Sequence, residues 1–365
     1  MLKRVSIVLL AVFMVVVNTN AGLPPKVNKV IAAIEAKKDK IQGGAVAIVY
    51  KGRVVYKTTF GHKRGKSGKV SADTLFPVGS LSKAISATAI ALLVEKGQLD
   101  LNHLVKFPCM VNPVSMAHLL SHTTGYKFSG NWQIEHGNSR QLLLSKLAKH
   151  QPKCNPGKCY RYSNTTFSLT EEYLSSQGLN LKQAITLLRK SIGEQGIHIV
   201  SVPKGMDVAY PHFRDKKTRA VTALPMPPYY TKVVPASAGV FLSLNAAIQV
   251  LKLNMGYYPQ VLSKETLAEM HKPYIANRDL DKWGLKLKLP CKKKLVKMRY
   301  GLGWRILSST KHPGQHMIFH GGYINGINSF MGFIPSEDIG LVMLANEERV
   351  SLKTGTEFWK NVLEK

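Results

Sequence analysis

Acidic residues are scarce in this sequence. Its 365 residues include 21 Asp and Glu against 51 Lys and Arg, which gives a formal net charge of +30. Such a charge favours acidic partners: anionic lipid, cell-wall polymer, lipopolysaccharide or nucleic acid. The densest basic run, KWGLKLKLPCKKKLVKMR at residues 282–299, has no nucleic-acid-binding motif around it, so no nucleic-acid partner is expected. A solvated lysine-rich loop on a generally basic surface is the simpler interpretation, and an acidic cell-envelope polymer is the alternative.

Cysteines are also few, and they are not clustered with histidines. The four are Cys109, Cys154, Cys159 and Cys291. Cys154 and Cys159 bracket an Asn-Pro-Gly-Lys turn, which favours this pair as a disulfide in an oxidising compartment. Four free thiols are an equally good interpretation, because a chain of this length can fold without disulfide bonds. A single C-x4-C with no clustered histidine partner is not a zinc signature, so no zinc site is expected.

Only one long apolar run occurs, and it lies at the N-terminus. Residues 1–21 combine a basic start, a 13-residue apolar run and small residues before Ala21, which is typical of a secretory signal peptide. The run is short for a membrane span, which needs roughly 20 residues, and an uncleaved anchor is the alternative. We therefore expect an exported protein, periplasmic or secreted, whose mature domain comprises residues 22–365.

The remaining pattern places strands at both ends of the chain and helices between them. A helix is expected over residues 25–40, a hairpin around Lys51-Gly52, and strands within residues 316–346 before a short C-terminal helix. Helices are predicted at residues 115–120, 139–150, 170–177, 181–192 and 243–255. This order indicates an α/β protein of the α+β type. One antiparallel sheet is built from residues of about 25–75 and 296–365, with flanking helices and a mainly helical part inserted at about 76–295.

The first candidate for chemistry is Ser80-Leu81-Ser82-Lys83, at the expected start of a helix. Ser80 and Lys83 are spaced i and i+3 and share one helix face. A lysine with a lowered pKa can accept the serine proton, and a helix N-terminus stabilises the oxyanion that follows. Taken alone, Ser80 as a helix cap with an exposed Lys83 is the simpler interpretation.

The second candidate is Tyr162-Ser163-Asn164, which follows the turn at Pro156. A tyrosine beside a lysine can pass protons to and from a leaving group. An asparagine amide can hold both a substrate carbonyl and the lysine. Taken alone, a buried tyrosine in a turn-rich loop explains the motif as well.

The third candidate is His320-Gly321-Gly322-Tyr323, within an expected strand. Two glycines let the strand backbone approach a ligand closely, and the Tyr323 amide can serve as an oxyanion donor. His320 can bind a carboxylate or tune the proton network. A bulged strand with a surface histidine is the simpler alternative.

Together, in this order along the chain, the three motifs resemble the signature of the penicillin-recognising serine hydrolases, the serine β-lactamase-like superfamily. The pattern is most similar to class C β-lactamases and D-alanyl-D-alanine carboxypeptidases, which have Y-x-N and either K-T-G or H-x-G. Residues 119–126, 237–243, 300–304 and 333–346 also look like the family. The resemblance implies the β-lactamase/transpeptidase-like fold, with Trp304 in the core and His122 as a structural residue beside the cleft.

The resemblance also implies roles. Ser80 becomes the acylated nucleophile, Lys83 its general base and Tyr162 the proton shuttle. The substrate-binding residues are Asn164, His320, Gly321, Gly322 and Tyr323, and the amides of Ser80 and Tyr323 form the oxyanion hole. The resemblance implies no metal and no organic cofactor.

Two positions depart from the K-T-G pattern. His320 replaces the lysine, and Gly321 lacks the hydroxyl that contacts a substrate carboxylate. The first hypothesis is an exported, penicillin-binding type D,D-carboxypeptidase that acts on the peptidoglycan stem peptide. The alternatives are a β-lactamase or an esterase on the same fold, or a non-catalytic protein that binds acidic cell-envelope polymer.

Overall fold

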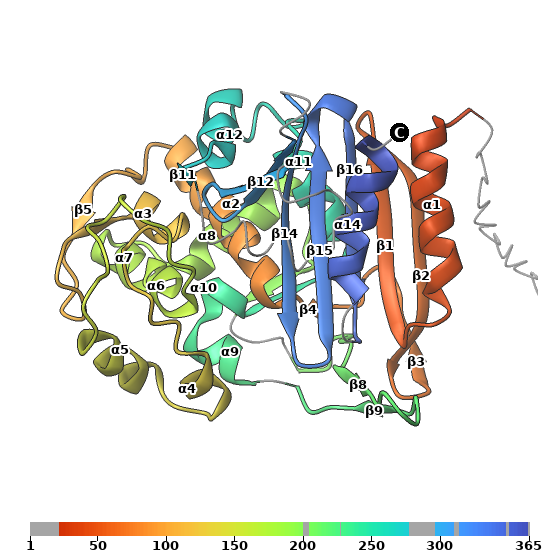
Figure 1. Ribbon diagram of the computed structural model, residues 1–365, viewed down its shortest axis with the longest axis horizontal. Coiled ribbons are helices and arrows are strands. Elements are labelled where there is room, and N and C mark those ends of the chain that lie inside the picture. Colours follow the sequence, from red (N-terminus) through yellow and green to blue (C-terminus); the bar gives the residue numbers. More distant parts are fainter. Residues whose placement is uncertain are drawn as a thin grey trace, which may run out of the picture.

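The protein is built around one large antiparallel sheet to which both ends of the chain contribute. The computed structural model describes residues 22–199, 204–226, 228–276, 296–309, 314–347 and 350–363. The sheet has nine strands in the order β11-β12-β13-β14-β15-β16-β1-β2-β3. β1 pairs with β16, so the red and blue parts of Figure 1 lie side by side. The predicted α+β architecture, with a sheet made from both termini, is confirmed.

The strands of this sheet differ greatly in length. Their bounds are β1 Gly43–Tyr50, β2 Arg53–Arg64, β3 Ser67–Lys69, β11 Ile275–Ala276, β12 Val296–Tyr300, β13 Arg305–Ser309, β14 His316–Ile324, β15 Ile327–Ile334 and β16 Ile339–Ala345. The hairpin at Lys51-Gly52 is confirmed. β12 and β13 were not predicted, and most of the basic run at 282–299 lies outside the described residues.

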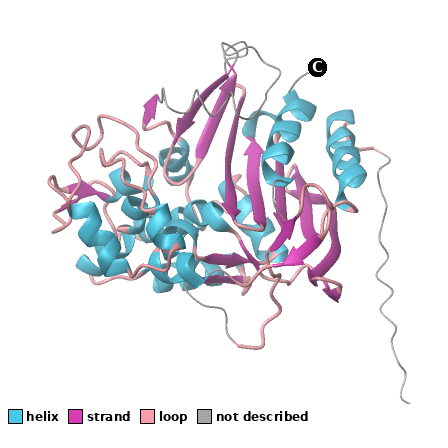
Figure 2. Cartoon of the chain, turned by 60° about the horizontal axis from the view of Figure 1, so that its bottom comes forward, coloured by secondary structure: helices cyan, strands magenta, loops and turns pink. Residues whose placement is uncertain are grey.

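Helices cover both faces of the sheet (Figure 2). α1 (Pro25–Lys38) and α14 (Val350–Leu363) pack on one face, where Val46 and Ile48 of β1 belong to their apolar cluster. α2 (Ser82–Glu95) and α11 (Leu244–Asn254) pack on the other, with Ala45 and Ala47. A strand buried on both faces is apolar throughout, which explains the GGAVAIVY sequence of β1.

The inserted part is mainly helical, as predicted. Its other helices are α3 Met116–Leu120, α4 Asn131–Glu135, α5 Arg140–Ala148, α6 Asn164–Ser168, α7 Thr170–Ser176, α8 Leu181–Ile192, α9 Pro228–Val233, α10 Pro235–Ala238 and α12 Lys264–His271. Ser115, Ser139 and Ser243 each cap a predicted helix by accepting a backbone N–H. No described helix is both long and apolar enough to span a bilayer.

Short strands in the same region were not predicted from the sequence. They are β4 Phe76–Pro77, β5 Leu104–Val105, β6 Val114–Ser115, β7 Ile197–Ile199, β8 His212–Arg214, β9 Val221–Ala223 and β10 Val240–Leu242. A strand of two or three residues is too short to show an alternation of apolar and polar side chains, so its conformation depends on pairing with strands from other parts of the chain. β4 leads directly into the 3-10 turn η1 (Gly79–Leu81) and α2, and so fixes the position of Ser80.

Helix α2 is buried on nearly all sides. Every residue from Ser82 to Leu93 is buried. Alanine, serine and threonine fill the rest of its surface, and small side chains let the sheet and α8 approach closely. The start of α2 is therefore held in place from several directions, which suits a position for chemistry.

Candidate active site

Ser80 lies in η1, directly before α2, with its side chain partly exposed. Gly79 has a φ of +53°, and a Cβ there would lie 3.0 Å from the amide nitrogen of Tyr323 in β14. A glycine is required because the left-handed conformation and the close approach of β14 both exclude a side chain. The two amides predicted to form the oxyanion hole thus belong to adjacent segments.

Lys83 is fully buried, which excludes the interpretation of an exposed lysine beside a helix cap. Its Nζ lies 2.6 Å from Oδ1 of Asn164, 2.9 Å from the carbonyl oxygen of Ser237 and 3.3 Å from Oγ of Ser80. A neutral amine can donate its two hydrogens to the two nearer oxygens. Its lone pair then faces the serine hydroxyl, the arrangement that a general base needs.

The protonation of Lys83 is coupled to that of Tyr162. Burial lowers the pKa of Lys83, whereas interaction with Tyr162 raises it in part. The Tyr162 hydroxyl donates to Oγ of Ser80 across 3.0 Å, and Nζ of Lys83 lies 4.8 Å from the Tyr162 ring centroid. Ser80 is therefore in contact with both groups that can take its proton.

Tyr162 is a stronger acid than an ordinary tyrosine. Burial raises its pKa, but the positive charges of Lys83 and Arg305, together with hydrogen bonds to Lys83 and Ser80, outweigh burial and hold the pKa below its usual value. A tyrosine that releases its proton more readily can act as a shuttle between the nucleophile and the leaving group. The predicted pair of Lys83 and Tyr162 around Ser80 is thus present in the structure.

Arg305 is a site residue that sequence reasoning missed. It lies at the start of β13, is only 8% exposed, and its guanidinium carbon is 5.4 Å from the Tyr162 ring centroid. It also lowers the pKa of Lys83. Nothing local in YGLGWRILSS marks this arginine as buried. Only the pairing of β13 with β14, which sets Arg305 opposite Phe319, brings it to the site.

His320 is placed differently from the prediction that it binds a substrate carboxylate. Its ring is fully buried, with Nε2 2.9 Å from the Tyr300 hydroxyl and Nδ1 2.8 Å from the carbonyl oxygen of Gly321. Burial, followed by the nearby charges of Arg305 and Lys83, lowers its pKa well below the usual value. A neutral, buried imidazole cannot supply the positive charge of the K-T-G lysine. A positive charge beside Tyr162 comes instead from Arg305.

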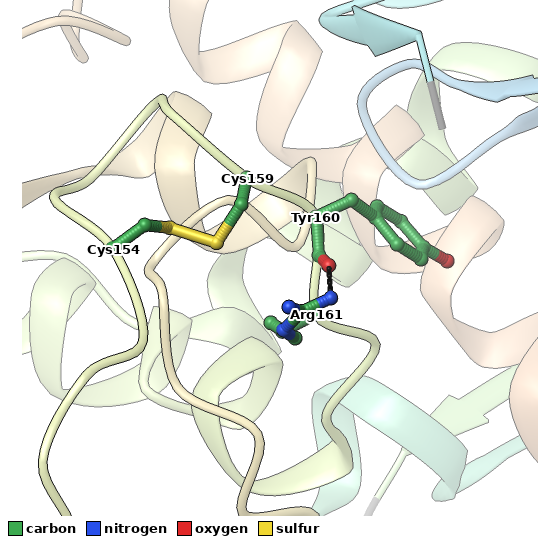
Figure 3. The surroundings of a disulfide bond; sticks show 4 residues. All are labelled: Cys154, Cys159, Tyr160 and Arg161. Atoms are coloured by element: carbon green, nitrogen blue, oxygen red, sulfur yellow. Dashed lines mark hydrogen bonds between the residues drawn. A yellow bond between two sulfur atoms is a disulfide. The ribbon is translucent and has the colours of Figure 1, made fainter. Parts of the chain in front are cut away.

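A short loop holds Tyr162 in position. Cys154 and Cys159 form a disulfide, as the sequence favoured, directly before Tyr160 and Arg161 (Figure 3). Cys109 is free, and Cys291 lies outside the described residues. The backbone N–H of Arg161 donates to the His122 carbonyl across 2.8 Å.

His122 supports this loop through its ring. The ring centroid lies 4.2 Å from that of Tyr162, and Nδ1 accepts the Ser163 N–H across 3.3 Å. Burial, followed by the nearby charge of Lys83, lowers the pKa of His122 well below its usual value, so the ring is neutral. These contacts agree with the expected structural role of His122.

Asn164 meets half of its expected role. Its Oδ1 accepts a hydrogen bond from Lys83, as the sequence suggested. Its amide nitrogen donates to Oδ1 of Asn131 on α4 across 2.8 Å. Asn131 is exposed, so a substrate carbonyl can replace it as the acceptor. Asn131 was not identified from the sequence.

The two glycines of β14 have different surroundings. β13 stops pairing with β14 at Phe319, which leaves the edge from His320 to Tyr323 facing η1. A Cβ on Gly322 would lie 1.8 Å from the carbonyl oxygen of Val78, whereas one on Gly321 would meet only the carbonyl oxygen of Ser329 at 3.5 Å. Gly322 is needed for the close approach of β14 to the nucleophile, and Gly321 is not.

We expect the two glycines to respond oppositely to substitution. Gly322→Ala forces the backbones apart and should cost about 1–3 kcal/mol of unfolding free energy, with loss of activity. Gly321→Ser should fold normally and raise kcat/KM about tenfold for substrates with a carboxylate, because it adds a hydroxyl donor. Thermal unfolding and kinetics of both variants test this, with Gly321→Ala as the control for added bulk. Equal tolerance of alanine at the two positions would contradict the packing described.

A serine in contact with a buried lysine and an acidic tyrosine is the arrangement that a serine hydrolase needs to activate its nucleophile. The model of the family described as Beta-lactamase matches residues 30–362, and the chain belongs to this family. It is a serine hydrolase of the β-lactamase family.

The curated relatives are distant. The chain is 24% identical over 366 residues to the unguisins hydrolase ungD' of Aspergillus campestris (strain IBT 28561), covering 89% of this chain but 62% of that protein. It is 21% identical over 337 residues to a β-lactamase of Pseudomonas fluorescens, covering 85% and 90%. The chain therefore spans less than two thirds of the first of these relatives.

Solved structures of the same fold cover most of the chain. The octameric penicillin-binding protein homologue from Pyrococcus abyssi has a TM-score of 0.73 at 22% identity, covering 91% of this chain and 76% of that one. The hydrolase EstCE1 has a TM-score of 0.73 at 18% identity, covering 93% and 98%. A class C β-lactamase mutant has a TM-score of 0.69 at 20% identity, also covering 93% and 98%. At these identities the likeness shows the fold alone.

Proposed function

We propose that this hydrolase cleaves a peptide bond in the manner of a D-alanyl-D-alanine carboxypeptidase. The supporting observation is the network in which Oγ of Ser80 lies within hydrogen-bond distance of both Nζ of Lys83 and the Tyr162 hydroxyl. Two proton acceptors beside one nucleophile allow one to activate the serine and the other to protonate the departing amine. An amine leaving group requires this protonation, because the nitrogen would otherwise have to leave as a strongly basic anion.

The reaction follows from these positions. Oγ of Ser80 attacks the carbonyl carbon while its proton passes to the pair of Lys83 and Tyr162. The oxyanion faces the amides of Ser80 and Tyr323. When the intermediate collapses, the C–N bond breaks, the proton returns through Tyr162 to the amine, and the acyl group remains on Ser80. Water, activated by the same pair, then releases the acid and restores Ser80.

An ester is the second candidate substrate. The space beside Gly321 holds no hydroxyl, and His320 carries no charge, so the carboxylate contact of the K-T-G enzymes has no counterpart in this strand. A substrate without a carboxylate loses nothing from that absence. The likeness to EstCE1, described as a hydrolase with promiscuous acyltransferase activity, is compatible with this choice.

Three substrates separate the candidates. A stem pentapeptide reports D-alanine release, nitrocefin reports β-lactam hydrolysis, and a short p-nitrophenyl ester reports esterase activity. We expect D-alanine release by the wild type and none by Ser80→Ala. Turnover of the ester alone would favour the esterase. No turnover of any of the three would contradict the proposed function and favour a non-catalytic binding protein.

We further propose that the protein is exported. The disulfide between Cys154 and Cys159 supports this, because such bonds persist in oxidising compartments. The N-terminal sequence of the mature protein is expected to begin at Gly22, and the protein should migrate without residues 1–21. A protein that retains Met1 when isolated from its native compartment would contradict cleavage and favour the uncleaved anchor.

A further inference from the structure

A cavity lies on the opposite face of the sheet from Ser80. It has a volume of about 620 Å³, within the range of about 300–1,000 Å³ typical of small-molecule sites. It opens between the end of α1, strands β2 and β16, α14, and the turn that joins β8 to β9. The apolar cluster under α1 and α14 borders it, whereas Ser80 contacts Lys83 of α2 on the other face. The cavity is therefore separate from the active site.

The inner wall of this cavity is apolar. Ile34 of α1, Leu341 and Met343 of β16, and Phe358 of α14 line it and are all buried. Phe213 of β8 lines the same cavity and is 40% exposed, although large apolar side chains are normally covered. Such a wall is suited to an alkyl chain rather than to a polar metabolite.

The rim of the cavity is positively charged. It carries three carboxylates: Glu347 is paired to Arg214, Glu357 is paired to Lys37, and Asp215 accepts backbone hydrogen bonds within its own turn. Among the described residues, no carboxylate lies within ion-pair distance of Lys40, Lys216, Lys217 or Arg219, which also line the cavity. Charges left unpaired around an apolar pocket attract a ligand whose head is negative.

The turn that carries Lys216 and Lys217 is held in place by its own hydrogen bonds. Oδ1 of Asp215 accepts hydrogen bonds from the backbone N–H of Lys217 at 2.8 Å and of Thr218 at 2.7 Å. Arg214 donates to the carbonyl oxygen of Lys40 across 3.1 Å, which ties the turn to the end of α1. A preorganised rim loses little conformational entropy on binding.

We propose that this cavity binds a single-chain anionic amphiphile, a long-chain carboxylate, with its alkyl chain against the apolar wall and its head at the Lys216 and Lys217 rim. Apolar wall, charged rim and volume together select this class over a neutral lipid or a hydrophilic anion. The inference does not depend on the substrate of Ser80, because the two sites share no residue.

Calorimetry with laurate, below its micelle concentration, tests the proposal in the Ser80→Ala variant, which removes acylation as a source of signal. We expect one laurate per chain, with affinity rising about fourfold per methylene from octanoate to laurate. Dodecyltrimethylammonium, which has the same chain and the opposite charge, should bind at least tenfold more weakly. Equal binding of the cation would overturn the proposal.

Two variants locate the binding. Ala33→Trp fills the cavity from α1, and Lys216→Glu with Lys217→Glu inverts the rim; each should weaken laurate at least tenfold. The control, Lys146→Glu with Lys149→Glu on and beside α5, makes the same charge change elsewhere and should leave binding unchanged. Thermal unfolding confirms that each variant folds. If the rim variant folds and binds laurate as tightly as the control, the cavity is not the site.

Discussion

Replacing Lys83 by methionine is expected to slow acylation of Ser80 about 10²- to 10⁴-fold, the usual contribution of a general base. Methionine has a similar length and no charge, so it can occupy the buried space that Lys83 fills between Asn164 and Ser237. It cannot accept a proton. The effect is measured as the rate of the first turnover of a chromogenic ester, compared between the variant and the wild type.

The control for this substitution lies at the opposite end of the same helix. Lys96→Met makes the same chemical change at an exposed position directly after α2 and should leave the rate unchanged. The unfolding midpoint of Lys83→Met should stay close to that of the wild type. The lost hydrogen bonds are offset because a buried amine no longer has to be desolvated. A folded Lys83→Met variant with an unchanged acylation rate would exclude Lys83 as the base.

Replacing Arg305 by glutamine is expected to reduce activity at neutral pH about 10- to 100-fold and to move the rising limb of the pH–rate profile to higher pH. The direction of this pH shift follows from the pKa values of Tyr162 and Lys83. Arg305 lowers the pKa of Tyr162 and that of Lys83, so its removal raises both. The pair then reaches its deprotonated, active form only at a more alkaline pH.

Three readouts separate an electrostatic role from a structural one. Activity of Arg305→Gln should recover as the pH is raised, which a distorted site would not show. Arg305→Lys restores a positive charge and should move the profile back toward that of the wild type. The fall should appear in kcat with KM little changed, because Arg305 acts through Tyr162. A profile of unchanged shape in Arg305→Gln would contradict this role.

Elements that carry a local sequence pattern were predicted from the sequence, and elements held in place by long-range strand pairing were not. Strands buried on both faces, such as β1 and β16, and helices begun by Ser115 or Ser243 carry their own local pattern. The strands were therefore predicted in the right parts of the chain, and the two helices with nearly correct bounds. Short strands such as β7 and β10 carry none, because long-range pairing holds them in place. The three motifs predicted the pair of Lys83 and Tyr162 around Ser80 through their resemblance to a family.

The parts that could not be predicted depend on which way a side chain points. The resemblance assigned His320 to the place of a lysine, but burial and the Tyr300 hydroxyl keep it neutral and inside the protein. Arg305 supplies a positive charge beside Tyr162 from the adjacent strand, a consequence of strand pairing rather than of any motif. The basic rim near Lys216 likewise becomes a site only once α1 and β8 lie together.

The central claim, that Ser80 is the nucleophile, is tested most directly by the mass of the intact protein after exposure to a fluorophosphonate, a probe that labels activated serines. We expect one adduct per chain on Ser80, full labelling of Ser82→Ala, and none of Ser80→Ala. Ser82 is the matched control because it is buried and its Oγ accepts the Val240 N–H at 2.9 Å. An adduct that persists in Ser80→Ala, or a wild-type protein that the probe never modifies, would contradict the mechanism.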